Sequence, residues 1–138
     1  LETAILYPGM CLLEGTNVTE GRGTNYPFQY IGAPWIDSSK IIRAIEGKHI
    51  PGVVFEPISF IPISIPGKSL KPKFENEKCY GIKIILIEKK IYKSVDTAAQ
   101  LLITIQELYP EKFQWNDFIY KLWGNGMILE YSKIRESL

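Results

Sequence analysis

The stretch Tyr80-Gly81-Ile82-Lys83-Ile84-Ile85-Leu86-Ile87-Glu88 is the clearest β-strand signal in the sequence. Its aliphatic centre favours a strand and suggests burial on both faces. Ser94 follows as a helix cap, and Asp96 lies in the first turn, where a negative charge favours the helix dipole. An apolar stripe at helical spacing then predicts a helix that Pro110 ends. The stripe consists of Ala98, Leu101, Leu102, Ile105 and Leu108.

Two further elements are expected on the N-terminal side of this strand. Residues 53–61 are rich in valine, isoleucine and phenylalanine, which predicts a strand after a Pro51-Gly52 turn. Asp37 or Ser38 can cap an earlier helix, and Gly47 can end it. The apolar stripe of that helix is Ile41, Ile42 and Ile45.

The segments between these elements give weaker signals. Residues 10–13 form a short apolar run, which is typical of a buried strand that delivers a loop. Residues 27–31 are expected to be partly extended until Gly32-Ala33-Pro34-Trp35 breaks them. Prolines make residues 62–78 a loop.

The C-terminal end is predicted to be helical. Residues 116–123 form an amphipathic pattern that Gly124-Asn125-Gly126 ends, and a last helix is expected over residues 127–138. Together the elements predict an α/β or α+β fold, with helices packed on a small sheet. The length of 138 residues fits a single domain.

Composition excludes several classes of function. A net charge of +1 gives no electrostatic reason to expect nucleic acid or an anionic membrane as a partner. No apolar run reaches the roughly 18 residues of a membrane-spanning helix. A single histidine and the lack of a Cys-x-x-Cys motif argue against a metal site, and we expect no cofactor. Cys11 and Cys79 are expected to be buried free thiols rather than a disulfide.

The loop Glu14-Gly15-Thr16-Asn17-Val18-Thr19-Glu20-Gly21-Arg22-Gly23-Thr24 is the stretch most able to bind a ligand. Its three glycines let the backbone approach a ligand closely. Asn17 and Arg22 offer donors, while Glu14 and Glu20 offer acceptors. This mixture suits a polyhydroxylated or anionic ligand, and a planar guanidinium can bind a carboxylate in bidentate fashion.

A purely structural loop is the alternative. Asn17 and the threonines can form local turns, with Arg22 tied to Glu14 or Glu20. The loop lacks Gly-Lys-Ser/Thr, and Gly21-x-Gly23 lacks the third glycine of a dinucleotide-binding motif. Glycoside hydrolysis needs two carboxylates, so the two glutamates are candidate contributors.

Aromatic side chains are secondary candidates. Tyr80 begins a strand after a polar loop and is a candidate to point into a cleft. His49 is expected at the surface. The remaining aromatics fit core packing better than stacking on sugars; they are Tyr26, Phe28, Tyr30, Trp35, Trp115 and Trp123.

The loop and its flanks also match a known pattern. The central stretches are Glu14-Gly15-Thr16-Asn17 and Gly21-Arg22-Gly23-Thr24. The match continues through Leu1-Glu2-Thr3-Ala4, Tyr7-Pro8-Gly9-Met10, Ile31-Gly32-Ala33-Pro34-Trp35-Ile36, Cys79-Tyr80-Gly81, Leu108-Tyr109-Pro110 and Phe113-x-Trp115. With these residues the chain, to about residue 123, resembles the NamZ-type exo-β-N-acetylmuramidases, a bacterial family long classed as a domain of unknown function.

The resemblance implies a two-domain enzyme that removes N-acetylmuramic acid from the non-reducing end of peptidoglycan fragments. A Rossmann-like N-terminal domain would carry the principal catalytic glutamate, and a smaller C-terminal domain would close the cleft. Residues 1–138 correspond to that C-terminal domain, with residues 1–10 as a connecting segment. We therefore expect the catalytic domain, the chief protein partner, to be missing from this sequence. The implied location is periplasmic or extracellular.

Carried onto this chain, the resemblance assigns contacts with the muramyl sugar to Glu14, Asn17, Glu20 and Arg22. Charge alone makes Arg22 the candidate for the lactyl carboxylate. Residues 62–78 depart from the shorter version common in the family, and residues 127–138 match poorly. The alternative is a non-catalytic module that binds cell-wall sugars or docks on a neighbouring domain.

Overall fold

The computed structural model describes residues 2–119. They form an α+β domain whose three strands make one antiparallel sheet in the order β1-β3-β2. The elements in chain order are α1 (Glu2–Met10), a 3-10 turn η1 (Cys11–Gly15), β1 (Tyr30–Ala33), α2 (Ser38–Glu46), β2 (Val53–Phe60), β3 (Cys79–Leu86) and α3 (Ser94–Leu108). Of the two predicted fold classes, the structure selects α+β, because neighbouring strands all run in opposite directions.

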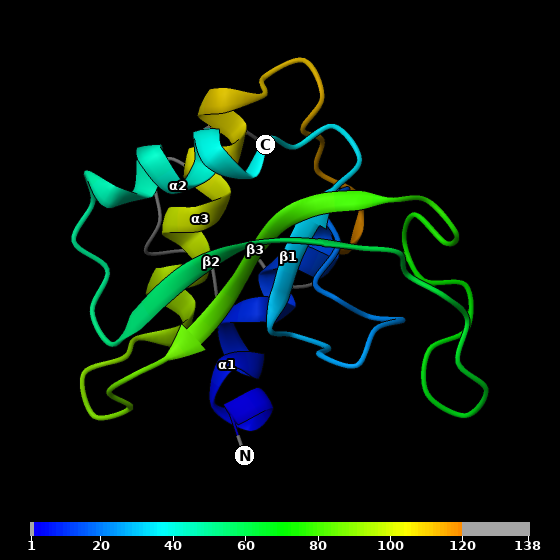
Figure 1. The fold of residues 1–138 in the computed structure, drawn as a ribbon, viewed down its shortest axis with the longest axis horizontal. Coiled ribbons are helices and arrows are strands. Elements are labelled where there is room, and N and C mark those ends of the chain that lie inside the picture. The colour runs from blue at the N-terminus through cyan, green and yellow to red at the C-terminus, as the bar shows by residue number, and fades with distance from the viewer. Residues whose placement is uncertain (1, 120–138) are drawn as a thin grey trace.

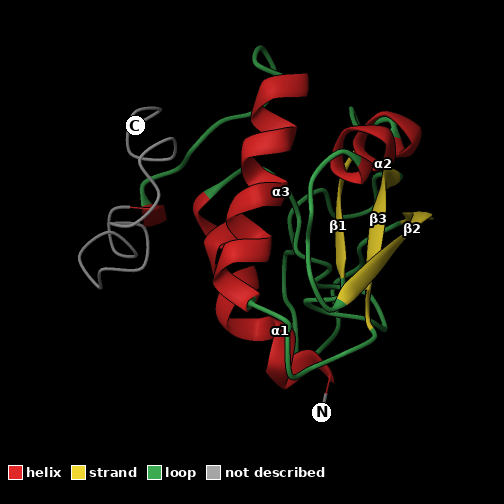
Figure 2. Ribbon diagram, turned by 90° about the vertical axis from the view of Figure 1, so that its left-hand side faces the viewer, coloured by secondary structure: helices red, strands yellow, loops and turns green. Residues whose placement is uncertain are grey.

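Strand β3 occupies the centre of the sheet, as its apolar sequence predicts (Figure 1). Its expected burial on both faces is wrong. Ile82 and Ile84 are fully buried, whereas Lys83 and Ile85 between them are only half-buried. The reason is visible in Figure 2, where α1 and α3 stand side by side on one side of the sheet. Alternate residues of an antiparallel strand face opposite sides, so only one set reaches the core.

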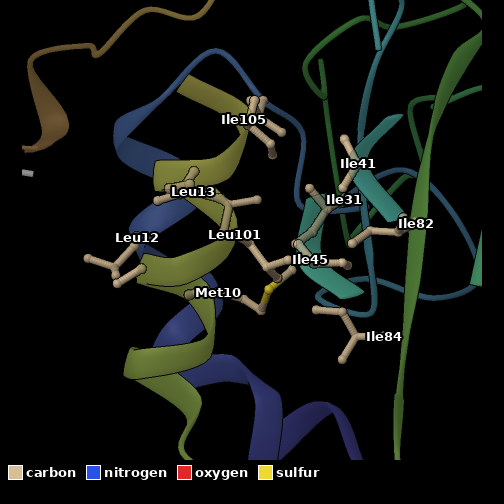
Figure 3. Close-up of a cluster of buried hydrophobic side chains, with 14 of the residues drawn as sticks. Met10, Leu12, Leu13, Ile31, Ile41, Ile45, Ile82, Ile84, Leu101 and Ile105 are labelled. Carbon is tan, nitrogen blue, oxygen red and sulfur yellow. The ribbon is translucent and has the colours of Figure 1, made fainter. Parts of the chain in front are cut away.

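The core fills the space between the helices and the covered face of the sheet (Figure 3). Ile31 and Ile82 lie opposite each other on β1 and β3 and point toward Leu101 of α3. Ile41 and Ile45 of α2 close the same cluster, and both are buried. Their spacing confirms the predicted stripe of that helix. Asp37 caps α2 by accepting a hydrogen bond from the Ser39 amide, and Gly47 follows its end, also as predicted.

The first ten residues differ from the prediction. The expected strand over residues 10–13 is wrong, because Met10 ends helix α1 and the 3-10 turn η1 follows. Pro8 inside α1 removes one helical N–H, and the amide of Gly9 instead donates to the Ser94 hydroxyl at 2.7 Å. That hydroxyl donates in turn to the Leu6 carbonyl at 2.9 Å. The segment expected only to connect therefore packs against α3.

These contacts also revise the start of α3. Ser94 is not its cap, and its hydroxyl instead joins the helix to α1. Lys93 holds the cap position without a side-chain capping bond, because an ammonium group cannot accept a hydrogen bond. The rest of the helix agrees with its predicted stripe, except that Leu108 is exposed. Strand β1 extends through Gly32 and Ala33, which were expected to break it.

The remaining predictions have mixed outcomes. Strand β2 and the long loop over residues 62–78 are confirmed, and His49 lies at the surface. The helices predicted over 116–123 and 127–138 fall largely or wholly outside the described residues. Within residues 2–119, no helix is long and apolar enough to cross a membrane.

Candidate functional site

The polar loop over residues 14–24 is held by its own threonines. The Thr16 hydroxyl donates to the Leu13 carbonyl at 2.8 Å and accepts from the Val18 amide at 3.1 Å. The Thr24 hydroxyl donates to the Gly21 carbonyl at 2.6 Å. Such side-chain-to-backbone bonds replace the hydrogen bonds that a loop otherwise lacks. The loop is therefore a rigid support, as the structural alternative predicted.

Glu20 is the buried centre of this loop, with only 2% of its surface exposed. Arg22 Nε lies 3.2 Å from Glu20 Oε1, and Lys73 Nζ lies 3.1 Å from Glu20 Oε2. The Lys73 ammonium also donates to the carbonyls of Leu13 and Val18, at 2.8 and 2.9 Å. All three ammonium hydrogens are thus used, and the buried carboxylate is balanced by two cations.

Arg22 joins this buried pair to a second carboxylate. Its Nη2 donates to Glu14 Oε1 at 2.7 Å, and this hydrogen bond is the main reason why the pKa of the guanidinium is raised. The guanidinium also lies over the Phe28 ring, 4.9 Å from its centroid. Only two of its five N–H donors point at these carboxylates, and 38% of its side chain remains exposed. Arg22 can still donate to a ligand.

A pocket of about 400 Å³ opens over this cluster. The loop contributes Glu14, Glu20 and Arg22 to its wall, and the long loop after β2 contributes the opposite wall. The second wall carries three lysines, namely Lys68, Lys71 and Lys73. Four cations against two carboxylates leave the pocket lining with an excess of positive charge. That balance suits a ligand carrying a carboxylate.

The structure separates the other two predicted site residues from this pocket. Asn17 accepts from the Gln114 amide at 2.9 Å and donates to the Lys112 carbonyl at 2.8 Å, so its amide holds the segment after α3. Tyr80 lies on β3 and lines a different pocket of about 510 Å³ near the start of α2. Glu14, Glu20 and Arg22 are brought together; Asn17 and Tyr80 are not.

Lys73 is the site residue that sequence reasoning missed. Nothing in the sequence around it marks a buried contact, because its partners lie more than fifty positions earlier.

Gly23 shows how closely the polar loop and the long loop after β2 approach each other. Its carbonyl accepts from the Ile63 amide at 3.0 Å, and a Cβ there would lie 2.6 Å from the Ile63 carbonyl oxygen.

The aromatic residues divide between core and surface. Phe28 is buried, as expected, and Trp115 packs partly buried against the core. The expected core position of Tyr26 is wrong, because its ring is exposed; Tyr30 and Trp35 are half-buried, and Trp123 lies outside the described residues. Both cysteines are free thiols, of which Cys79 is buried and Cys11 half-buried. Among residues 2–119, no group of histidines, cysteines and acidic residues could hold a metal ion.

Fold and site together define a small α+β domain that presents one charged pocket on a rigid polar loop. The chain belongs to the family described as Exo-beta-N-acetylmuramidase NamZ, C-terminal, whose sequence model matches residues 5–136. This finding confirms the resemblance seen in the sequence.

One curated relative is the Peptidoglycan beta-N-acetylmuramidase NamZ of Bacillus subtilis (strain 168). It is 36% identical over 130 residues, which cover 93% of this chain and 30% of the relative, so the chain spans less than a third of that protein. The solved structure of a DUF1343 family protein from Bacteroides fragilis NCTC 9343 has a TM-score of 0.69 at 22% identity. That likeness covers 78% of this chain and 27% of the other, and it shows the shared fold.

Proposed function

We propose that this chain is the substrate-side domain of an exo-acting glycoside hydrolase that releases N-acetylmuramic acid from the non-reducing end of peptidoglycan fragments. The observation that carries the proposal is the positively charged pocket over Glu14 and Arg22, in a chain of the NamZ C-terminal family. Muramic acid differs from glucosamine by a lactyl ether that ends in a carboxylate. A cationic pocket lined with hydrogen-bonding groups suits that difference.

Arg22 is the proposed contact for the lactyl carboxylate, through the donors that Glu14 and Glu20 leave unused. Lys68 and Lys71 are exposed on the opposite wall and add to the attraction. Glu14 is half-buried at the pocket and can accept from sugar hydroxyls. Asn17 is proposed to act indirectly, because its side chain fixes the first part of the loop to residues 112–114.

The principal catalytic carboxylate is proposed to lie in a preceding Rossmann-like domain. Glu20 does not suit general acid–base work, since its carboxylate is almost fully buried and both its oxygens are paired with cations. Glu14 alone cannot supply the pair of carboxylates that glycoside hydrolysis requires. The location proposed for the whole protein is periplasmic or extracellular, where peptidoglycan fragments occur.

A binding module without a catalytic partner is the second candidate. It is favoured by a different observation, namely that both loop glutamates are bound to one guanidinium. In that case the pocket would retain wall fragments without any role in their hydrolysis.

Binding and turnover together test the proposal. We expect this chain to bind N-acetylmuramic acid more tightly than N-acetylglucosamine by titration calorimetry, and Arg22→Lys to reduce that preference. Lys68→Gln with Lys71→Gln should do the same, since neither lysine forms an ion pair within residues 2–119. Arg43→Lys on the exposed face of α2 is the matched control. Equal affinity for both sugars would contradict the assignment of the pocket.

The turnover arm uses a chromogenic N-acetylmuramic acid glycoside. We expect none from this chain alone and turnover once the preceding domain is supplied. Hydrolysis by this chain alone would place the catalytic machinery here and refute the division between domains. Binding without turnover in the two-domain protein would support the binding module instead.

A further inference from the structure

We propose that the pocket between Trp35, Tyr80 and Tyr109 is a second glycan-binding site, which takes a neutral pyranose ring of the N-acetylhexosamine class. It shares no lining residue with the pocket over residues 14–24. The choice of a glycan among amphipathic ligands rests on the proposed function. The site itself rests on its own geometry.

Three aromatic rings line this open surface pocket of about 510 Å³. Trp35 and Tyr109 meet edge to face, with ring centroids 5.4 Å apart. Tyr80 stands on β3 beside them and is 41% exposed. Large aromatic surfaces left partly exposed around one hollow can stack on the C–H face of a sugar ring.

Hydrogen bonds hold one of the rings and the elements around the pocket in place. The Tyr109 hydroxyl accepts a hydrogen bond from the Asp37 amide at 2.8 Å, across 72 positions of sequence. The Ser38 hydroxyl donates to the Gly81 carbonyl of β3 at 2.7 Å, which joins the start of α2 to the strand that carries Tyr80. These bonds fix the Tyr109 ring and the backbone beside Tyr80, which reduces the ordering that binding must impose.

The polar groups at the rim suit hydroxyls rather than a strong charge. The Asp37 carboxylate is exposed there and can accept from sugar hydroxyls, while Lys40 can donate. Their charges balance, in contrast to the cationic pocket over Arg22. The Tyr109 hydroxyl accepts from the Asp37 amide and keeps its own proton for a further acceptor. A neutral ring with several hydroxyls and an amide fits this set.

The test titrates this chain with N,N′,N″-triacetylchitotriose, which is neutral and lacks the lactyl group. We expect saturable binding by calorimetry, with affinity at least tenfold weaker for Trp35→Ala and for Tyr80→Ala. Tyr80→Ala removes an exposed ring and keeps the variant comparison valid if Trp35→Ala fails to fold. Tyr26→Ala removes another exposed tyrosine outside this pocket and should leave the affinity unchanged.

Titrating each variant with the ligand of the other pocket then shows whether the two pockets bind independently. Arg22→Lys should leave chitotriose binding unchanged, and Tyr80→Ala should leave the affinity for N-acetylmuramic acid unchanged. Absence of chitotriose binding, or binding that neither aromatic variant weakens, would overturn the second site. Those results leave the muramic acid arm unaffected, so failure here is distinct from failure of the proposed function.

Discussion

Glu20 and Lys73 lie 53 positions apart in the sequence, yet Lys73 Nζ stands 3.1 Å from Glu20 Oε2. This ion pair joins the long loop after β2 to the polar loop over residues 14–24 and so forms the floor of the charged pocket. The same ammonium satisfies two backbone carbonyls. Both walls of the proposed site therefore depend on one lysine.

The first prediction concerns this lysine. Lys73→Met should destabilise the domain by about 2–3 kcal/mol, because it leaves a buried carboxylate with one cation and removes the donor of the Val18 carbonyl, while the Leu13 carbonyl keeps its bonds from Thr16. Urea unfolding measures the change. Lys89→Met, at an exposed turn after β3, is the control and should lie within about 0.5 kcal/mol of the parent chain. Equal stability of the two variants would contradict the role given to Lys73.

The second prediction concerns the contact between α1 and α3. A Cβ on Gly9 would lie 1.9 Å from the Ser94 carbonyl oxygen, so Gly9→Ala must push the two helices apart. We expect a loss of about 3 kcal/mol in unfolding free energy. Gly47→Ala is the matched control, since it is exposed, has negative φ and meets nothing closer than 3.7 Å. That variant should be neutral or more stable by up to about 1 kcal/mol. A Gly9 variant as stable as its control would show that the helices separate easily.

Helix α2 shows what the sequence can predict by itself. Its cap, its apolar stripe and its terminal glycine all lie within eleven residues, so local pattern suffices. Helix α1 shows the opposite case. Pro8 and Gly9 interrupt its pattern, and the bonds that compensate come from Ser94, 85 positions later. No local signal could reveal a partner at that distance.

In the candidate site, too, local sequence predicts some residues, whereas partners distant in the sequence appear only in the tertiary structure. Residue types in the loop indicated Glu14, Glu20 and Arg22, and the structure brings those three together. Nothing in the loop sequence indicates that Lys73 pairs with Glu20. Nor does it indicate that the Gln114 amide donates to the side chain of Asn17. Donors and acceptors that look available for a ligand can already be used by distant backbone, and only the tertiary structure shows which are.

The third prediction follows for Asn17. Asn17→Ala removes both side-chain bonds to residues 112–114 and should loosen that segment. Hydrogen exchange at the amide of Gln114 should become at least tenfold faster, and stability should fall by about 1–2 kcal/mol. Asn25→Ala, at an exposed bend with no positive φ, is the control for an asparagine substitution. Unchanged exchange at Gln114 would mean that the backbone bonds alone hold the segment.

The last prediction uses the two thiols. Burial, helped by the nearby Glu77 carboxylate, raises the pKa of the Cys79 thiol from 9.0 to about 12. At pH 8 its thiolate fraction in the folded chain is then about 10⁻⁴, roughly a thousandfold below an ordinary cysteine. Burial also raises the pKa of Cys11, but that side chain is half-buried. We therefore expect iodoacetamide to label Cys11 first at pH 8, with mass spectrometry identifying the site.

The raised pKa also fixes the sign of a stability change at high pH. Below about pH 9 the Cys79 thiol is protonated in both the folded and the unfolded chain. Between pH 9 and about 12 only the unfolded chain loses its proton, so stability falls as pH rises through that window. Cys79→Ala removes this titration, and its unfolding free energy should depend less steeply on pH than that of the parent chain. Parallel pH profiles for the two proteins, or labelling of Cys79 as fast as Cys11, would show that the Cys79 thiol ionises readily in the folded domain.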